Sequence, residues 1–429
     1  LADGRRQAYC DRDTARRNPC SMLTFYRENA RWLLGGFLLT LFSGFGQTFF
    51  ISIWSSEIRA DFGLSHGDFG LIYMIATLAS ASVLPTVGRL VDITSVATTS
   101  VIVISMLAVA ALTMTMAQSL PILCLAIFLL RLFGQGMMTH TAITAMGRWY
   151  VDNRGKAVST ATIGHQFSEG MGPIIFVALA FTYGWRETWL IASLVLVLVA
   201  MPLIYGLMRV ERIPRSVASS DNAANETGKQ WTRSEMLMDP LFWLTGVGVF
   251  SPAFIGTSIF FHQDYLIEIN GWSPSLYYQS FAVMATMTVI VSLSTGFAID
   301  RWSAAKLLPM FMLPLALACL VLGLFSAPPT IVVFMVLLGF SYGMTSTLFG
   351  AIWPEVYGTR HLGSLRAITV SMMVFMSAAG PGVTGWLIDQ GIAFSTQLLF
   401  MAAFCMVALV LMFYASRGYI LRLNAASNA

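Results

Sequence analysis

The sequence has few charged residues. Only 11% of its 429 residues are Asp, Glu, Lys or Arg, whereas a soluble domain has roughly 25%. Apolar residues make up 56% of the chain, and the mean hydropathy is +0.71. Such a chain cannot cover its surface with polar groups in water. The composition therefore excludes an ordinary soluble protein and favours a lipid environment.

Cysteine and histidine are also scarce, with five of each. The cysteines show neither close pairing nor metal-type spacing, so they read as small buried apolar residues. The sequence has no phosphate-binding glycine loop and no nucleophile beside a base. His165 and Glu169 alone supply too few ligands for zinc. We therefore predict no cofactor, no metal, no nucleic-acid partner and no enzymatic activity.

Two stretches of the chain repeat each other. Gly63-Leu64-Ser65 precedes an apolar run that ends at Asp92, and Gly271-Trp272-Ser273 precedes one that ends at Asp300. The offset is constant, since 271 − 63 and 300 − 92 both give 208. A duplicated set of apolar helices is typical of membrane transporters built from two related halves.

The long apolar runs predict transmembrane helices, because a helix needs ~20 mainly apolar residues to cross a bilayer. The runs do not alternate as strands would. We expect an all-α membrane protein of about twelve spans, arranged as two pseudo-symmetric halves of six. The approximate cores are 31–55, 66–90, 96–117, 119–147, 155–182, 186–209, 238–263, 273–299, 305–326, 329–352, 363–388 and 393–416.

The basic residues indicate the orientation. Every Lys and Arg except Arg59, Arg131 and Arg186 falls on one side of this map, and cytoplasmic loops carry such an excess. We expect a multi-pass protein of the cell's inner membrane with both termini cytoplasmic. Residues 1–21 are expected to be a disordered tail or an extension, 22–209 and 238–429 the two bundles, and 210–237 a cytoplasmic linker.

The halves end their second and eighth spans in a recognisable motif. Gly88 and Asp92 form Gly-x-x-x-Asp, and Gly296, Asp300 and Arg301 form a fuller copy. On these residues the chain resembles the major facilitator superfamily from about residue 30 to about residue 417, which implies that family's fold and alternating access.

The resemblance also implies a gate on the cytoplasmic side. Asp92 can pair with Arg148 or a helix N-terminus, and Asp300 with Arg360. The glycines let the helices approach closely. The alternative is that these charges are solvated loop residues.

Arg131 lies inside the fourth span, in Arg131-Leu132-Phe133-Gly134-Gln135-Gly136. The family has an Arg before Gly-x-Gly at this place. A cation in hydrocarbon normally faces a partner or water, so we predict that Arg131 attracts an anionic substrate or takes part in coupling. The alternative is a structural pair.

His165 and Glu169 are four residues apart in the fifth span and share one helical face. Burial favours the neutral form of a carboxyl, and a nearby imidazole or Arg favours the ionised form. We predict a proton-coupling group of Glu169, His165 and Arg131. The alternative is a polar clamp between helices.

Further polar side chains lie in spans that line the central cavity in the family. The predicted substrate-binding residues are Gln47, Arg131, His140, Tyr342 and Thr345. Arg131 and His140 are nine residues apart, on roughly opposite faces of one helix, which favours Arg131 over His140. His262, Gln263 and Asp264 are gate or capping candidates at the outer end of the seventh span.

The sequence therefore predicts a secondary transporter for a small, monocarboxylate-like organic anion, coupled to protons and functional as a monomer. The first half faintly resembles bacterial porters of the oxalate–formate and monocarboxylate branch. The alternatives are a proton-driven efflux antiporter for a lipophilic drug or metabolite and a non-transporting sensor on the same fold.

Overall fold

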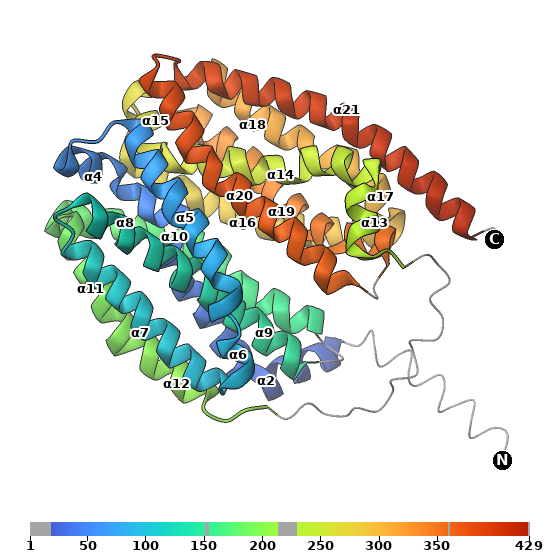
Figure 1. Ribbon diagram of the computed structural model, residues 1–429, viewed down its shortest axis with the longest axis horizontal. Helices are drawn as coiled ribbons and strands as arrows, with labels where there is room; N and C mark the ends of the chain where they lie inside the picture. The colour runs from blue at the N-terminus through green and yellow to red at the C-terminus, as the bar shows by residue number, and fades with distance from the viewer. Residues whose placement is uncertain (1–18, 151–153, 213–229, 359–360, 428–429) are drawn as a thin grey trace.

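A computed structural model describes residues 19–150, 154–212, 230–358 and 361–427, and every element in these ranges is a helix (Figure 1). Residues 1–18 of the expected tail, 1–21, lie outside the described residues. The remaining three residues belong to α2, which begins at Pro19. Most of the expected linker, 213–229, also lies outside the described residues. The linker's last residues form a short helix, α13.

The first half contains the spans built from α2 to α12. Its main helices are α2 (Pro19–Phe42), α3 (Thr48–Ile51), α4 (Ser55–Phe62), α5 (His66–Val87), α6 (Leu90–Ile93), α7 (Val96–Thr115), α8 (Leu120–Leu129), α9 (Thr139–Trp149), α10 (Arg154–Tyr183), α11 (Trp185–Val195) and α12 (Met201–Met208). A π-helical segment, Leu130–Met138, joins α8 to α9, and another, Leu196–Ala200, joins α11 to α12.

The second half repeats this order with fewer interruptions. Its helices are α13 (Arg233–Met238), α14 (Pro240–Phe261), α15 (Gln263–Asn270), α16 (Pro274–Trp302), α17 (Ala304–Leu307), α18 (Met312–Leu324), α19 (Pro329–Tyr357), α20 (Leu362–Asp389) and α21 (Phe394–Ser427).

The helix boundaries confirm the repeat. The helices α4 and α15 have bounds exactly one repeat apart in number, at 55–62 and 263–270, and α10 and α20 begin at 154 and 362. Gly63 and Gly271 both end their helices in the left-handed conformation, each with φ of 63°. A side chain with a Cβ rarely adopts this conformation, so glycine is required there.

The number of apolar helices fits the expected twelve-span fold. Ten helices are long and apolar enough to cross a membrane, and a pair bent by 45°, 24–46 with 48–62, forms an eleventh candidate. The fifth predicted span is α10, a helix of 30 residues. It carries Glu169 and His165 and completes the set of twelve.

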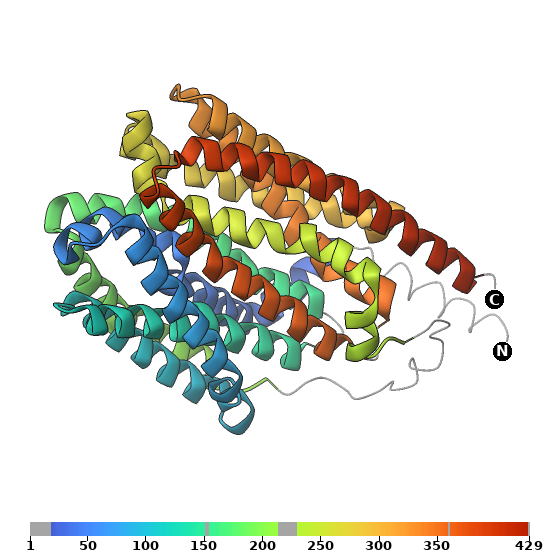
Figure 2. The ribbon, with the colours of Figure 1, turned by 45° about the horizontal axis from the view of Figure 1, so that its top comes forward.

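The two bundles meet at one end of the molecule (Figures 1 and 2). We call this the closed end, defined by Gly63, Asp264 and Asp389, and the opposite end, with Asp92 and the start of α13, the linker end. The halves pack through α5 against α20 and α10 against α16. A Cβ on Gly70 would lie 2.4 Å from the carbonyl oxygen of Pro381, so these helices touch through their backbones.

Candidate functional site

The first span is broken in its middle. After α2 a 3₁₀ turn, Ser43–Gly46, leads to Gln47, whose backbone is extended (φ −84°, ψ 156°), and α3 then begins at Thr48. The break removes intrahelical partners from backbone groups around it. Transporters commonly bind substrates and ions at such discontinuous helices, where backbone groups are exposed.

The fourth span is irregular at the same level. Its π-helical segment contains Arg131 and Gly134. A Cβ on Gly46 would lie 2.1 Å from the carbonyl oxygen of Leu130, and one on Gly134 would lie 2.6 Å from the Cα of Gly46. The two irregular segments therefore cross in direct backbone contact, which only glycine permits. π-Helical turns occur frequently at functional sites.

Arg131 is held at this crossing. Its Nη1 donates to the carbonyl oxygen of Gly46 (3.1 Å) and to Thr48 Oγ1 (3.3 Å), and its guanidinium carbon lies 5.2 Å from the ring centroid of Tyr73. Arg131 is 1% exposed. Arg131 therefore has a structural role, because its side chain donates a hydrogen bond to the Gly46 carbonyl group, which lies at the break in the first span.

The other edge of the guanidinium group is unpartnered. Nε and Nη2 are buried and have no hydrogen-bond partner, and no ion pair among the described residues includes Arg131. These two nitrogens lie on the same side of the planar group, and their parallel N–H bonds match the two oxygens of a carboxylate. The site thus presents one buried, oriented, bidentate donor.

Tyr73 links this donor to the second half. Its hydroxyl bonds with Thr48 Oγ1 (2.7 Å), and its ring packs against Phe261 of α14 with centroids 4.7 Å apart. Gln47, 8% exposed, is next to both Gly46 and Thr48 in the chain. The backbone of Gln47 therefore lies at the crossing that holds Arg131. Tyr73 was not predicted, because its contact with α14 is set by the packing of the halves.

Glu169 lies at a different place on the contact between the halves. It is 5% exposed, and its neighbour Gly170 packs so closely on α16 that a Cβ there would lie 2.7 Å from Ala285 Cβ. The Glu169 carboxyl and the Tyr342 hydroxyl are close enough to interact electrostatically. No described ion pair joins Glu169 to Arg131 or His165. The ring of His165 instead packs edge-on against Phe49.

The remaining cavity candidates separate into two groups. Tyr342 packs against α14, where its hydroxyl would lie 2.0 Å from a Cβ on Gly256, and Thr345 is buried with an unpartnered Oγ1. His140 is exposed and lies beside Gly88, toward the linker end. Tyr342 and Thr345 thus belong to the middle of the second half, whereas His140 lies away from Arg131.

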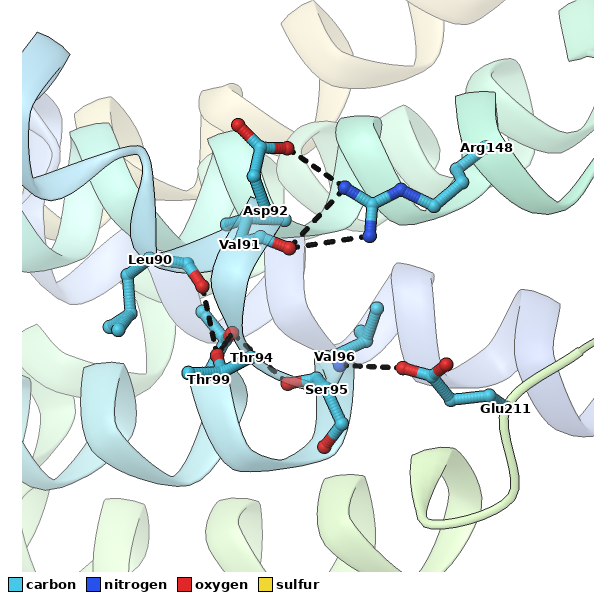
Figure 3. A network of polar contacts seen from close by, with 9 residues as sticks. All are labelled: Leu90, Val91, Asp92, Thr94, Ser95, Val96, Thr99, Arg148 and Glu211. Carbon is cyan, nitrogen blue, oxygen red and sulfur yellow. Dashed lines mark hydrogen bonds and ion pairs between the residues drawn. The ribbon is translucent and has the colours of Figure 1, made fainter.

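The motif after the second span forms an ion pair within its own half (Figure 3). Arg148 Nη2 donates to Asp92 Oδ1 (2.9 Å), and both nitrogens Nη1 and Nη2 of Arg148 donate to the carbonyl oxygen of Val91 (3.3 Å). Glu211, after α12, accepts the N–H of Val96 at the start of α7. The Arg148 bonds hold the loop between α5 and α7 against the fourth span, and the Glu211 bond holds the start of α7 against the segment after α12.

The second copy of the motif is described only in part. The Asp300 side chain and all of Arg360 lie outside the described residues, so their expected pairing is not tested. Arg301 is exposed and lies over the Trp302 ring. Glu355 accepts the N–H groups of Ala304 and Ala305 (2.8 and 3.1 Å) and so caps α17. Glu355 was missed because its partners are 51 and 50 residues away in the chain.

At the closed end Asp389 joins the halves. Its Oδ2 accepts from Ser65 Oγ (2.6 Å) and from the N–H of Gly67 (2.7 Å), and its Oδ1 accepts from the N–H of His66 (3.2 Å). A carboxylate of α20 therefore caps the N-terminus of α5 in the other half. This position is electrostatically favourable for an anion.

Asp264 and His262 lie at the same end. Asp264 accepts the hydroxyl of Tyr278 (2.7 Å) and, across the halves, the N–H of Ser56 (3.4 Å), its equivalent in the repeat. Burial raises the pKa of Asp264 from 3.8 to about 7. Burial lowers the pKa of His262 from 6.5 to about 3, and its ring lies 5.8 Å from that of His66. Both groups change their environment if this end opens.

Comparisons with known proteins agree with this arrangement. The sequence profile of the Major Facilitator Superfamily matches residues 36–381 and, in a second match, 253–426. Comparison with the sequences of characterised proteins finds no match.

Solved structures with a similar fold include a bacterial homologue of the human lysosomal transporter Spinster. In its inward-facing, unoccupied conformation the TM-score is 0.70 at 15% identity, over 92% of this chain and 98% of that one. In its occupied conformation the values are 0.69 and 17%, over 91% and 97%. A mutant of the nucleoside transporter NupG gives 0.64 and 13%, over 90% and 99%.

Proposed function

The chain belongs to the Major Facilitator Superfamily, and from that premise we propose that it carries a small, monocarboxylate-like organic anion across the cell's inner membrane by proton-coupled alternating access. Both termini lie in the cytoplasm in this proposal, because the Lys and Arg residues gather on the linker side. The proposal also takes the protein to function as a monomer. The faint resemblance to oxalate–formate and monocarboxylate porters points to the same substrate class.

The observation that carries this proposal is the unpartnered edge of Arg131. Its Nε and Nη2 are buried without acceptors, although a buried donor without a partner costs about 1–3 kcal/mol. A carboxylate would satisfy both N–H groups and neutralise the charge. Tyr73 connects Arg131 to Phe261 of the other half. An anion bound to Arg131 would therefore alter the Tyr73–Phe261 contact, which lies between the halves that move during transport.

The proton pathway in this proposal includes Glu169. Its side chain is buried where α10 meets α16, a contact that a rocking motion of the halves alters. No cation is paired with it among the described residues. A carboxyl whose burial changes with conformation binds a proton in one state and releases it in the other.

The test of the substrate class uses Arg131→Lys in proteoliposomes. Lysine keeps the charge and one donor for Gly46, but it lacks the parallel N–H pair. We expect the KM for counterflow of labelled short carboxylates to rise at least ~10-fold, which corresponds to about 1.4 kcal/mol. Arg186→Lys, at a half-buried arginine that bonds Ala117 and Asp61, is the matched control. An unchanged KM for every carboxylate tested would refute an anion site at Arg131.

A second candidate function, proton-driven efflux of a lipophilic cation, is favoured by the surroundings of Glu169. This carboxyl has no ion-pair partner among the described residues and lies near the Tyr342 hydroxyl, and its neighbour Gly170 packs against Ala285 of α16. Competition experiments separate the two functions. Short carboxylates should inhibit counterflow by an anion carrier, whereas lipophilic cations should inhibit an efflux antiporter. Ligand binding without any counterflow would indicate a sensor.

A further inference from the structure

The outer surface of the second half has an apolar groove along α14. It is a hollow of about 680 Å³ between α14, α20 and α21. Figures 1 and 2 show α14 running between α20 and α21. The groove is lined mostly by apolar side chains, five of which are aromatic: Trp243, Phe250, Phe254, Phe400 and Phe404. We call it the α14 groove.

The α14 groove opens toward lipid. Trp243 is 47% exposed and Phe400 is 72% exposed, and the groove's walls belong to three helices that are long and apolar enough to cross the membrane. The helices that α21 mainly packs against all belong to the second half, so its exposed apolar side chains face away from the other bundle and toward lipid. The space is therefore accessible to a molecule dissolved in the bilayer.

The shape of the groove suits an extended chain. A second hollow, lined by Leu237, Met238 and Pro240, shares Trp243 and Val247 with the first. Together they follow α14 from Pro240 to Ile255, which is roughly 22 Å at 1.5 Å per residue. This length is most of the ~30 Å thickness of the hydrocarbon core. A compact ligand would not fill such a space, but an acyl chain would.

One polar side chain marks one end of the groove. Gln397, in the first turn of α21, lines the groove and is 4% exposed. Its Nε2 donates to the carbonyl oxygens of Ile392 (3.0 Å) and Thr384 (3.4 Å), which fixes the orientation of the amide. Its Oε1 is buried without a partner. Buried acceptors in proteins usually have a hydrogen-bond donor, so a ligand hydroxyl could bind Gln397 Oε1.

We propose that the α14 groove binds a single-chain amphiphile from the bilayer, with its acyl chain along α14 and a hydroxyl-bearing head at Gln397. The head then lies near the closed end, because Gln397 follows Asp389 and the short loop to α21. The chain passes Phe400 and Phe254 and ends beside Trp243. The site is separate from Arg131 and does not depend on the transported substrate.

The experiment uses two photoactivatable probes with the same diazirine-bearing acyl chain. One is a monoacylglycerol, with two hydroxyl donors, and the other is the methyl ester, with none. The full-length protein is placed in phosphatidylcholine nanodiscs, since that headgroup has no hydrogen-bond donor. After irradiation, mass spectrometry measures labelling of residues 240–261 and 394–404 against labelling of the lipid-facing residues of α7.

We expect the monoacylglycerol to label the groove ~5-fold more than the methyl ester, the ratio given by one hydrogen bond of about 1 kcal/mol. Gln397→Met should remove this preference and leave labelling by the ester unchanged. Gly246→Leu should reduce labelling by both probes, because a Cβ there already lies 2.9 Å from the Phe250 ring. Gly206→Leu is the control, since nothing lies within 4 Å of its Cβ.

Three results would overturn the proposal. Equal labelling of the groove and of α7 would make the groove ordinary lipid-facing surface. Equal labelling by the two probes in the unaltered protein would remove the role of the head. A preference that persists in Gln397→Met would place the head elsewhere. None of these results bears on carboxylate counterflow, so the anion site proposed at Arg131 is tested independently of the α14 groove.

Discussion

Replacing Asp264 by asparagine is expected to make acid open the closed end more strongly than it opens the unaltered protein. The carboxyl has a pKa of about 7 in the closed arrangement and 3.8 when fully solvated. The closed form therefore binds the proton more tightly, and a fall in pH stabilises it. Between pH 8 and pH 5 the ratio of closed to open forms rises at most roughly 90-fold through this group.

His262 acts in the opposite direction. Its pKa is about 3 when closed and 6.5 when solvated, so acid protonates the open form preferentially. Over the same interval this group shifts the ratio toward the open form by up to roughly 30-fold. His66, at the same end, has a pKa of about 4 when closed and acts in the same direction as His262 by a similar factor, so acid should open the unaltered protein modestly. Asp264→Asn leaves the effects of both histidines, and His262→Gln leaves the Asp264 effect partly offset by that of His66.

Distance measurements between spin labels test this prediction. Ala60 and Glu268 are exposed, occupy equivalent positions of the repeat on α4 and α15, and can carry the labels once the native cysteines are replaced by alanine. Acid should lengthen the distance in Asp264→Asn and shorten it in His262→Gln. The other titratable side chains that interact with Asp264 or His262 are present in both variants: Glu57, Arg59, His66, Tyr278 and Asp389. Identical pH profiles in the two variants would refute the reasoning.

Three further substitutions test other contacts. Glu169→Gln should abolish proton-driven accumulation but preserve counterflow, and unchanged accumulation would remove Glu169 from the mechanism. Asp389→Asn should raise the ratio of open to closed forms, read from the spin-label distances, ~2- to 5-fold, because an exposed anion at a helix N-terminus contributes about 0.3–1 kcal/mol. Arg422→Gln should lower stability by about 3–5 kcal/mol, measured by thermal unfolding, since Arg422 makes two hydrogen bonds (2.7 and 3.0 Å) to the buried carboxylate of Asp239.

The repeat made much of the fold predictable. An offset of 208 residues, together with the apolar runs and the distribution of basic residues, gave the two halves and most of the spans. The pair of Asp92 and Arg148 followed from the motif, because both residues lie within one half at the ends of neighbouring spans. The spans and the Asp92–Arg148 pair depend on local composition and on contacts within one bundle, so patterns in the sequence can predict them.

The break at Gln47 and the π-helical segment around Arg131 were not predictable in the same way. Neither segment contains a proline, and both read as continuous helices by hydropathy. They arise because Gly46 and Gly134 allow a backbone contact that is closer than regular helices permit. The contacts of Asp389 and Tyr73 across the halves depend on how the bundles dock, and no local pattern encodes that docking.

The two halves use the same helix crossing differently. Position 134 of the first half corresponds to position 342 of the second, where Tyr342 packs against Gly256, the equivalent of Thr48. Position 131 corresponds to Gly339, where a Cβ would lie only 2.5 Å from the carbonyl oxygen of Met284. No side chain fits there, so the second half cannot hold a matching cation.

This asymmetry constrains transport. If an anion binds Arg131, its charge is fixed to the first half, while the second half contributes Tyr342 and the apolar face of α14. The substrate would then move with the first half. The contact of Tyr73 with Phe261 would transmit substrate binding to the second half. Phe261→Ala should accordingly leave carboxylate binding to Arg131 within about threefold of normal but weaken its coupling to the spin-label distances at the closed end. Loss of binding together with coupling would instead place part of the anion site on α14.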